Sequence, residues 1–447
     1  MILYHAPWVL PVAAPPIRDG TVGVEGERIA YVGPRAGAPP GADRELGEVV
    51  LMPGLVNAHT HLELTAMRGF LEQLGFQPWI DRLTRARRAV LAEPDVLLDC
   101  ARWGIVEGLR AGVTTYADTS DSSAPFHAMR ELGVRGVMYQ EVFGPDPAQC
   151  PGALAGLREK VERLRPSETA LVRVGVSPHA PYSVSDTLFA ATAHYAGDEG
   201  LPLAVHVAES AEESEYVTAA GGPWARSHAA RGIHVAPRGR SSIAMLERTG
   251  VLRPNALLIH CVRADPADVA AIAAGGCGVA HCPASNAKLG HGVAPLVALL
   301  AAGVRVGIGS DSVASNNRMD ILDEARLAVL MQRARLGDPL AVPGALALEL
   351  ATLGGARALG IDDRVGSLEP GKDADLAAFS LRARRAVPVQ DPADAAVFAL
   401  SGCDAKFVAV AGRVRVRDGR LVDEDQALGS RVQAAADRLA AWAGTNA

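Results

Sequence analysis

Two histidines separated by one residue, His59 and His61, end an apolar run in the segment PGLVNAHTHLELTAMRG, residues 53–69. In an extended strand, side chains alternate between two faces, so these two imidazoles point the same way and Thr60 points the other way. Two imidazoles aimed at one point are typical of a metal site. An isolated His-x-His pair is as often one core histidine and one surface histidine, so the rest of the chain must decide.

Four further residues that bind metals or move protons stand near the ends of other apolar runs. They are His179 in LVRVGVSPHA, His206 in LPLAVHVAE, His260 in ALLIHCV and Asp311 in VRVGIGSDS. Accidental placement would scatter such residues between both ends of the runs. Their shared position therefore indicates a single site.

Three neutral imidazoles and one carboxylate suit zinc or another divalent transition metal, with a position left for water. We expect the ligands to be His59, His61, His206 and Asp311. Such an ion lowers the pKa of its bound water from about 15.7 toward 7 and so supplies hydroxide at neutral pH. The predicted chemistry is hydrolysis.

Hydroxide alone does not expel a poor leaving group such as ammonia, so a proton carrier must lie nearby. Glu209 follows His206 by three residues, where the strand opens into its loop, and is placed to carry this proton without binding the metal. The alternative is a helix-start glutamate that interacts with the helix dipole. His260 has apolar neighbours, as a core histidine would, but its place at the strand end makes it an electrostatic partner for the attacking water.

The elements that must position these residues are eight apolar runs separated by segments of helical periodicity. Continuous apolar strands alternating with helices predict an α/β fold with a parallel sheet, and eight of them predict a (β/α)8 TIM barrel. Active sites of such barrels lie at the carboxyl ends of the strands. The remaining four runs are EVVLMPGLVNAH, GVTTYADT, GVRGVMYQEV and GVAHCPAS.

Short alternating strands at both ends of the chain predict a second, smaller unit. We expect residues 1–52 and 361–425 to form a composite β domain, a small β-sandwich made from the N- and C-terminal segments. Residues 53–360 then form the barrel, and residues 426–447 a C-terminal helix.

The composition argues against several classes of partner. A formal net charge of −6 over 447 residues gives no basic surface for nucleic acid or an anionic membrane. The six cysteines include no Cys-x-x-Cys pair, which argues against a thiolate zinc site and a disulfide framework. The first twenty residues lack a basic start and are broken by prolines, so we expect no cleaved signal or anchor, and a cytoplasmic enzyme.

Seven motifs stand in order along the chain: MPGLVNAHTHLE, SPHAPYSV, HVAES, LLIHCV, HCPASNAKLGHGVAP, GIGSDSVASNN and GSLEPGKDADL. Together they resemble the amidohydrolase superfamily, and more narrowly its mononuclear aminohydrolase branch. That branch includes S-adenosylhomocysteine/methylthioadenosine deaminases, guanine deaminase and chlorohydrolase-type enzymes. The resemblance runs from about residue 20 to about residue 420.

The resemblance implies one zinc ion, or iron as in some relatives, held by the four ligands already named. In the implied mechanism Asp311 accepts a proton as hydroxide attacks the carbon that bears the amino group. Glu209 protonates the adjacent ring nitrogen, His260 orients the water, and ammonia leaves. The chain is thus expected to be a hydrolase of carbon–nitrogen bonds other than peptide bonds, of the cyclic amidine deaminase type.

The loops after the strands carry the signals for the substrate. NAHTHLELT followed by GFQPWI looks like the aminodeoxyfutalosine deaminases, whose substrate is an adenosine-like nucleoside with an aromatic carboxylate. We expect His179, Glu63 and Trp79 to contact the substrate, with packing or solvent-exposed roles as the alternatives for Glu63 and Trp79. A substrate carboxylate would find basic partners in the next segment, at Arg82, Arg85, Arg87 or Arg88, unless these line a solvated helix face.

The expected function is deamination of an adenine-type nucleoside such as aminodeoxyfutalosine, adenosine or S-adenosylhomocysteine. Guanine deaminase or chlorohydrolase-type chemistry on another N-heterocycle is the alternative among enzymes. A non-catalytic binding module is the alternative of another class. The binuclear amidase type is disfavoured because the fourth strand, LVRVGVSPHA, lacks the bridging lysine. Relatives often associate, so a homodimer is compatible with the sequence beside a monomer.

Overall fold

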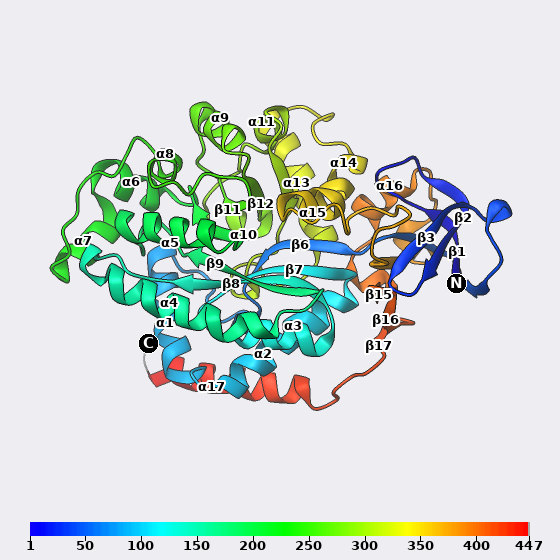
Figure 1. The fold of residues 1–447 in the computed structure, drawn as a ribbon, viewed down its shortest axis with the longest axis horizontal. Coiled ribbons are helices and arrows are strands. Elements are labelled where there is room, and N and C mark those ends of the chain that lie inside the picture. Colours follow the sequence, from blue (N-terminus) through cyan, green and yellow to red (C-terminus); the bar gives the residue numbers. More distant parts are fainter. Residues whose placement is uncertain (446–447) are drawn as a thin grey trace.

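The computed structural model describes residues 1–445 and places a parallel barrel beside a smaller mixed sheet (Figure 1). Eight neighbouring parallel strands run in chain order from β6 to β13. The predicted (β/α)8 fold class is confirmed. The strands are β6 (Leu55–Thr60), β7 (Val113–Ser120), β8 (Arg135–Val142), β9 (Val172–Pro178), β10 (Leu203–Val207), β11 (Ala256–His260), β12 (Gly278–His281) and β13 (Arg305–Ile308).

The first and last strands of the barrel approach each other at their carboxyl ends. The backbone N–H of Asp311 donates to the carbonyl of His59 at 2.9 Å, and the Thr60 hydroxyl donates to the carbonyl of Asp311 at 3.2 Å. These bonds tie the loop after β13 to β6 and nearly close the barrel. Two predicted metal ligands from opposite ends of the barrel sequence are thereby brought side by side.

The first apolar run is divided between the two sheets. β5 (Val49–Pro53) belongs to the mixed sheet, and β6 begins the barrel only after Gly54. A Cβ atom at Gly54 would lie 2.2 Å from the hydroxyl oxygen of Thr114, so only glycine fits where the chain crosses from one sheet to the other.

Small side chains and one large ring fill the barrel interior below the site. Ala58, Ala117, Val137, Tyr139 and Ala204 are all buried there together with residues of β11 and β12. Because this layer is packed, the chemistry is confined to the carboxyl ends of the strands above it.

Helices cover the outside of the barrel (Figure 1). Several begin at a serine or aspartate whose side chain accepts a hydrogen bond from the first turn, as Ser185, Ser210 and Asp265 do. The helices are α1 (Phe76–Val90), α2 (Pro94–Arg110), α3 (Ala124–Leu132), α4 (Cys150–Leu164), α5 (Asp186–Asp198), α6 (Ala211–Ala219), α7 (Gly222–Ala230), α8 (Ser242–Arg248), α9 (Pro266–Ala274), α10 (Pro283–Lys288), α11 (Leu296–Ala301), α12 (Val313–Asn316), α13 (Ile321–Leu336), α14 (Gly344–Glu349) and α15 (Gly355–Ala358).

Both chain ends build the second sheet, which is one mixed sheet of nine strands with its own buried core. Arg135, at the start of β8, joins it to the barrel through buried ion pairs with Asp373 at 2.8 Å and Asp375 at 3.0 Å. The strands run in the order β17 (Arg420–Leu421), β16 (Arg413–Arg417), β15 (Ala405–Val410), β14 (Leu376–Ser380), β5, β1 (Ile2–Val9), β2 (Ile17–Glu25) and β3 (Arg28–Pro34), with β4 (Ala42–Glu45) beside β1.

The short helix α16 (Pro392–Asp394) follows β14, and the C-terminal helix α17 (Leu428–Thr445) returns along the barrel to α1 and α2 (Figure 1). Arg431 of α17 pairs with Asp99 of α2 at 2.7 Å, and Arg438 pairs with Glu93 at 3.0 Å. No helix among residues 1–445 has the length and apolar character needed to cross a membrane.

Candidate metal centre and active site

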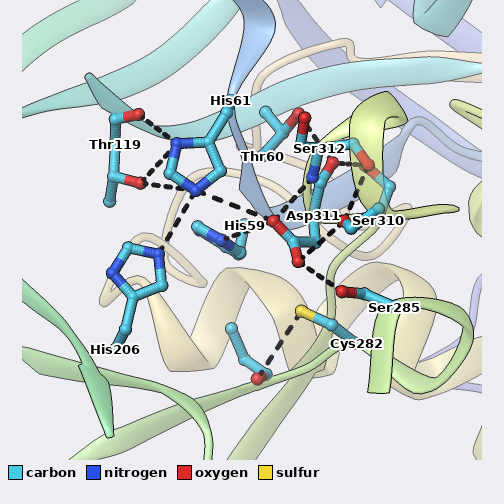
Figure 2. A network of polar contacts seen from close by, with 12 residues as sticks. His59, Thr60, His61, Thr119, His206, Cys282, Ser285, Ser310, Asp311 and Ser312 are labelled. Atoms are coloured by element: carbon cyan, nitrogen blue, oxygen red, sulfur yellow. Dashed lines mark hydrogen bonds and ion pairs between the residues drawn. The ribbon is translucent and has the colours of Figure 1, made fainter. Parts of the chain in front are cut away.

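The structure brings the four predicted metal ligands together at the carboxyl end of the barrel (Figure 2). The Nε2 atoms of His61 and His206 are 3.3 Å apart. An Oδ1 of Asp311 lies 3.3 Å from Nε2 of His59 and 3.6 Å from Nε2 of His61. One ring nitrogen each of His59, His61 and His206 fall within 4.8 Å of one another, which is the spacing of ligands around one ion.

Backbone carbonyls orient two of these imidazoles. Nδ1 of His61 donates to the carbonyl of Thr119 at 2.8 Å, and Nδ1 of His206 donates to the carbonyl of His179 at 3.0 Å. With the proton on Nδ1, each ring presents the lone pair of Nε2 to the centre. Such partners behind a ligand are what fix its tautomer in metal sites.

His59 supplies a direct test of whether the residues fit a metal ion. It is fully buried. Its Nε2 faces Oδ1 of Asp311 at 3.3 Å without the geometry of a hydrogen bond, and its Nδ1 has no hydrogen-bond partner among the described residues. Burial lowers the pKa of His59 to about 4, so the ring is neutral at pH 7. A buried imidazole without a hydrogen bond is costly unless it binds something. The neutral ring beside a carboxylate fits a divalent cation.

Asp311 is held in place by hydroxyls and by the backbone. Its Oδ2 accepts from the hydroxyls of Ser285 at 2.5 Å and Ser315 at 3.0 Å, and its Oδ1 accepts from the N–H of Ser312 at 2.6 Å. Burial alone would raise the pKa of Asp311, but the neighbouring imidazoles, His59 first, hold it well below its usual range. Its left-handed backbone, with φ of 57°, is the kind of strain that occurs at functional sites.

Glu209 lies beside this centre, buried, with one carboxylate oxygen between two imidazoles. Oε1 is 3.5 Å from Nε2 of His260 and 3.4 Å from Nε2 of His291. Burial alone would raise the pKa of Glu209, yet these two histidines hold it below its ordinary value. Glu213 fixes the loop by accepting from the N–H groups of Ala208 at 2.7 Å and Glu209 at 3.2 Å.

His260 lies close both to the predicted metal ligands and to Glu209, the predicted proton carrier. A ring nitrogen of His260 lies within ligand spacing of His59 and Asp311, and its Nδ1 is 3.0 Å from Oδ1 of Asn286. Its backbone is also left-handed, with φ of 76°. The ring is therefore positioned between Asp311 and Glu209, where it can contact a water that attacks a substrate.

The three predicted substrate contacts differ in their surroundings. His179 lies at the site, with its ring 4.9 Å from that of His206, while its Nδ1 bonds to the Ser183 hydroxyl at 2.7 Å. Trp79 on α1 is buried, and its indole N–H has no partner among residues 1–445. Both contacts stay predictions that these positions allow.

Glu63 is also buried, but protein groups occupy its oxygens. Oε1 accepts from Nε of Arg87 at 2.9 Å, and Oε2 accepts from the Ser120 hydroxyl at 2.7 Å and from the Ser122 hydroxyl. These bonds anchor α1 to the end of β7. A substrate contact at Glu63 stays a prediction that has to compete with this arrangement.

The arginines of α1 do not share one role. Arg82 lies over the ring of Phe70 and Arg85 over that of Trp442, at 5.0 Å and 6.0 Å. Arg87 and Arg88 instead line a cavity of about 730 Å³ beside the barrel rim, together with Lys160 and Arg163 of α4. Asp95 and Asp121 line the same cavity, and Asp121 pairs with Lys160 at 2.8 Å. None of the four predicted metal ligands lines it.

The sequence reasoning missed His291, Glu141 and an aromatic cluster near the rim. The ring of Phe76 is 4.6 Å from that of His291, and Tyr182 stacks on Trp224 at 4.3 Å. His291 falls inside the motif HCPASNAKLGHGVAP but at no strand end, so the strand-end rule passed over it. Glu141 lies in the strand run GVRGVMYQEV, two residues after Tyr139 on the same face, which was an available signal.

Comparison with known proteins agrees with this geometry. The family described as "Amidohydrolase family" matches residues 50–415. A 5-methylthioadenosine/S-adenosylhomocysteine deaminase of Moorella thermoacetica is 34% identical over 92% of this chain and 93% of its own length.

Two solved structures extend the comparison. An adenosine deaminase from Xanthomonas campestris with bound zinc has a TM-score of 0.87 and 30% identity, over 98% of each chain. The atrazine chlorohydrolase TrzN from Arthrobacter aurescens, complexed with zinc, has a TM-score of 0.81 and 26% identity, over 98% of this chain and all 100% of its own.

Proposed function

Because this chain belongs to the amidohydrolase family, we propose that it is a hydrolytic deaminase that releases ammonia from an adenine-type nucleoside. As the sequence predicted, the chain is a hydrolase of carbon–nitrogen bonds other than peptide bonds. One observation carries the proposal: a buried proton carrier, Glu209, lies beside the metal ligands and between two imidazoles.

The residues that would hold the metal are His59, His61, His206 and Asp311, and zinc is the ion in the two solved relatives. A divalent ion supplies a water whose pKa falls toward about 7, which makes hydroxide available at neutral pH. Three neutral imidazoles and one carboxylate match the ligand types zinc prefers.

The protein's own residues then manage the protons. We assign to His260 the orientation of the attacking water. Glu209, ionised before the reaction, takes the first proton of that water and delivers it to the ring nitrogen next to the reacting carbon, which weakens the bond to the amino group. We assign to Asp311 the acceptance of the second proton of the water. The proton gained by Asp311 passes to the amino group, and ammonia leaves.

Two features favour deamination over amide hydrolysis by a two-metal site. β9 contains no lysine that could bridge a second ion. Glu209 is placed to protonate a ring nitrogen rather than to bind metal, since its nearest basic neighbours are His260 and His291. A purely binding role is disfavoured because every ligand and the proton carrier are present.

The substrates we propose within this class are adenosine, S-adenosylhomocysteine-like nucleosides and aminodeoxyfutalosine. For a substrate with an anionic tail that extends out of the site, the basic partners we propose are Arg88 and Arg163 of the cavity beside α1. Chlorohydrolase or guanine deaminase chemistry is the second candidate, since an atrazine chlorohydrolase shares the fold.

The deciding experiment measures ammonia and chloride release by the zinc-loaded protein. The panel contains adenosine, S-adenosylhomocysteine, aminodeoxyfutalosine, guanine and a chlorinated triazine. We expect ammonia release from the adenine nucleosides, at a rate that falls at least 100-fold in Glu209→Gln. The control is Glu215→Gln, which should keep the wild-type rate because Glu215 is exposed on the neighbouring helix α6. Chloride release alone, or no release from any compound, would contradict the proposal.

We also propose a cytoplasmic enzyme that acts on a small molecule as a monomer or homodimer. None of the six cysteines, all within the described residues, forms a disulfide, and five of them are buried. Such unpaired thiols suit a reducing compartment.

A further inference from the structure

A buried glutamate that the mechanism does not use, Glu141, faces the barrel interior at its functional end. Val137 and Tyr139 of β8 pack into the barrel interior. Side chains two residues apart on a strand point to the same face, so Glu141 follows them one layer higher, at the rim. It is only 7% exposed.

The carboxyl group of Glu141 lacks a partner among the described residues. Its Oε1 is buried and accepts no hydrogen bond from any described residue. No basic side chain of residues 1–445 forms an ion pair with Glu141, in contrast to Glu63, which is held by Arg87. Buried carboxylates in folded proteins are almost always satisfied, so an unsatisfied one indicates that a ligand provides the missing donor.

The immediate neighbours of Glu141 cannot provide that donor. One oxygen of Glu141 and one ring nitrogen each of His179 and His206 lie within 4.8 Å of one another. Nδ1 of His179 donates to the Ser183 hydroxyl, whose own proton goes to the carbonyl of Ala180. The other nitrogen of His179 is then an acceptor, as is the carboxylate. When Glu141 is ionised, this corner of the site offers only acceptors. Burial raises the pKa of Glu141 to about 8, and donors supplied by a ligand would favour its ionised form.

Glu141 and the reacting groups lie on different flanks of the centre. One ring nitrogen each of His59 and His260 lies within 4.8 Å of an oxygen of Asp311. An oxygen of Glu141 lies equally close to nitrogens of His179 and His206. Because His206 belongs both to the predicted metal ligands and to the group around Glu141, a part of the substrate that extends past His206 from the reacting carbon would meet Glu141.

From this arrangement we infer that Glu141 binds the sugar of the nucleoside, by accepting hydrogen bonds from its 2′- and 3′-hydroxyl groups. The inference rests on the proposed function and adds to it the residue that recognises the ribose. Two neighbouring hydroxyls supply the two donors that a carboxylate accepts best. Glu141 is then a specificity residue, while the proton steps stay with Asp311 and Glu209.

A second metal ion is a poorer occupant of this corner. Nδ1 of His206 already donates to the carbonyl of His179, and its Nε2 faces His61 in the first ligand set. His206 has no nitrogen left for another ion. Only Glu141 and one nitrogen of His179 would remain, which is too few protein ligands for a site of its own.

The test compares adenosine with 2′-deoxyadenosine, 3′-deoxyadenosine and 5′-deoxyadenosine as substrates of the wild-type protein, Glu141→Leu and Glu141→Gln. The wild type should turn over adenosine and 5′-deoxyadenosine at least 10-fold more efficiently, in kcat/KM, than the 2′- and 3′-deoxy compounds. Glu141→Leu should raise KM for adenosine about 10- to 100-fold, change kcat less than threefold and abolish the discrimination.

The melting temperature separates this role from a structural one. Removing an unpartnered buried carboxylate should leave the melting temperature of Glu141→Leu unchanged or raise it, whereas a structural glutamate would lower it. Glu162→Leu, an exposed glutamate of α4, is the matched control and should change neither KM nor discrimination.

The outcomes distinguish this inference from the proposed function. No ammonia from any nucleoside would refute the proposed function itself. Equal turnover of all four nucleosides by the wild type would refute the sugar contact alone. If the leucine variant does not fold, unchanged discrimination in Glu141→Gln would refute it in the same way. Two zinc ions per wild-type chain that fall to one in Glu141→Gln would also overturn it, because Glu141 would then be a metal ligand.

Discussion

The Nε2 atom of His291 lies 3.4 Å from Oε1 of Glu209, the same carboxylate oxygen that His260 approaches to 3.5 Å. Burial would lower the pKa of His291, but Glu209 raises it above its ordinary value. The same contact lowers the pKa of Glu209. His291 is thus placed to stabilise the ionised form of the proposed proton carrier, a role that motif and strand position did not reveal.

Replacing His291 by phenylalanine should move the acidic limb of the kcat–pH profile to higher pH. The reason is that His291 holds the pKa of Glu209 down, so its removal lets burial raise that pKa. We expect kcat at neutral pH to fall about 10-fold. Steady-state kinetics between pH 5 and about pH 9 measure both effects.

His194→Phe is the control, because His194 is 78% exposed on α5 and pairs only with Asp198. It should leave the profile unchanged. An acidic limb that stays in place in His291→Phe would show that Glu209 does not depend on His291.

Removing the Ser285 hydroxyl should weaken metal binding. Ser285 donates to Oδ2 of Asp311 at 2.5 Å, and Ser315 donates to the same oxygen at 3.0 Å. Residues behind a ligand typically affect metal affinity by about 10- to 100-fold, so Ser285→Ala should raise the zinc dissociation constant by that factor. Competition with a chelator of known affinity measures it.

Ser214→Ala serves as the reference, since Ser214 bonds only to its own helix, through the carbonyl of Ser210. Zinc affinity in Ser285→Ala equal to that of the reference would show that Ser315 and the backbone suffice to hold Asp311.

Zinc removal should also lower the melting temperature of the wild type, because the ion binds only the folded chain.

The grouping of the four predicted metal ligands could be expected from the sequence because each lies within three residues of the carboxyl end of a strand. A parallel barrel brings the carboxyl ends of all strands to one rim, so His61 and His206 had to meet once eight strands were recognised. The structure places their Nε2 atoms 3.3 Å apart. Local pattern and topology were enough for this part of the site.

The rest of the site depends on contacts that no local pattern encodes. Glu63 meets Arg87 across 24 residues, and this pairing places α1 against the barrel rather than against solvent. His291 reaches Glu209 from a loop that follows α10. The division of one apolar run at Gly54 likewise depends on the closeness of Thr114, 60 positions further on. Side-chain partners at such separations follow only from the folded structure.

The pairing of Glu63 with Arg87 should appear as a stability effect. Arg87→Met would leave a buried carboxylate without its cation, and the Glu63→Gln change would then relieve that cost. We expect Arg87→Met to lower the free energy of unfolding by about 2 kcal/mol or more, and the double variant to recover at least half of the loss. Urea denaturation of the two single variants and the double variant gives the coupling. A higher KM in the Glu63→Gln variant, without any loss of stability, would instead support the predicted substrate contact at Glu63.

Glu213 should make stability depend on pH near neutrality. Burial raises the pKa of Glu213 to about 7 in the folded chain, whereas an unfolded glutamate titrates near its ordinary value of about 4.3. A raised folded-state pKa means that the folded chain holds its proton longer than the unfolded chain. The resulting stability is full below about pH 4 and is lost as the pH rises to about 7.

Glu213→Gln has no such titration, so its stability relative to the wild type should increase by about 1 to 3 kcal/mol between pH 5 and 8. Chemical denaturation at several pH values measures the difference, with Glu215→Gln on the exposed side of α6 as the control that should show no slope. A flat difference for Glu213→Gln would mean that the hydrogen bonds from Ala208 and Glu209 keep Glu213 ionised throughout this range.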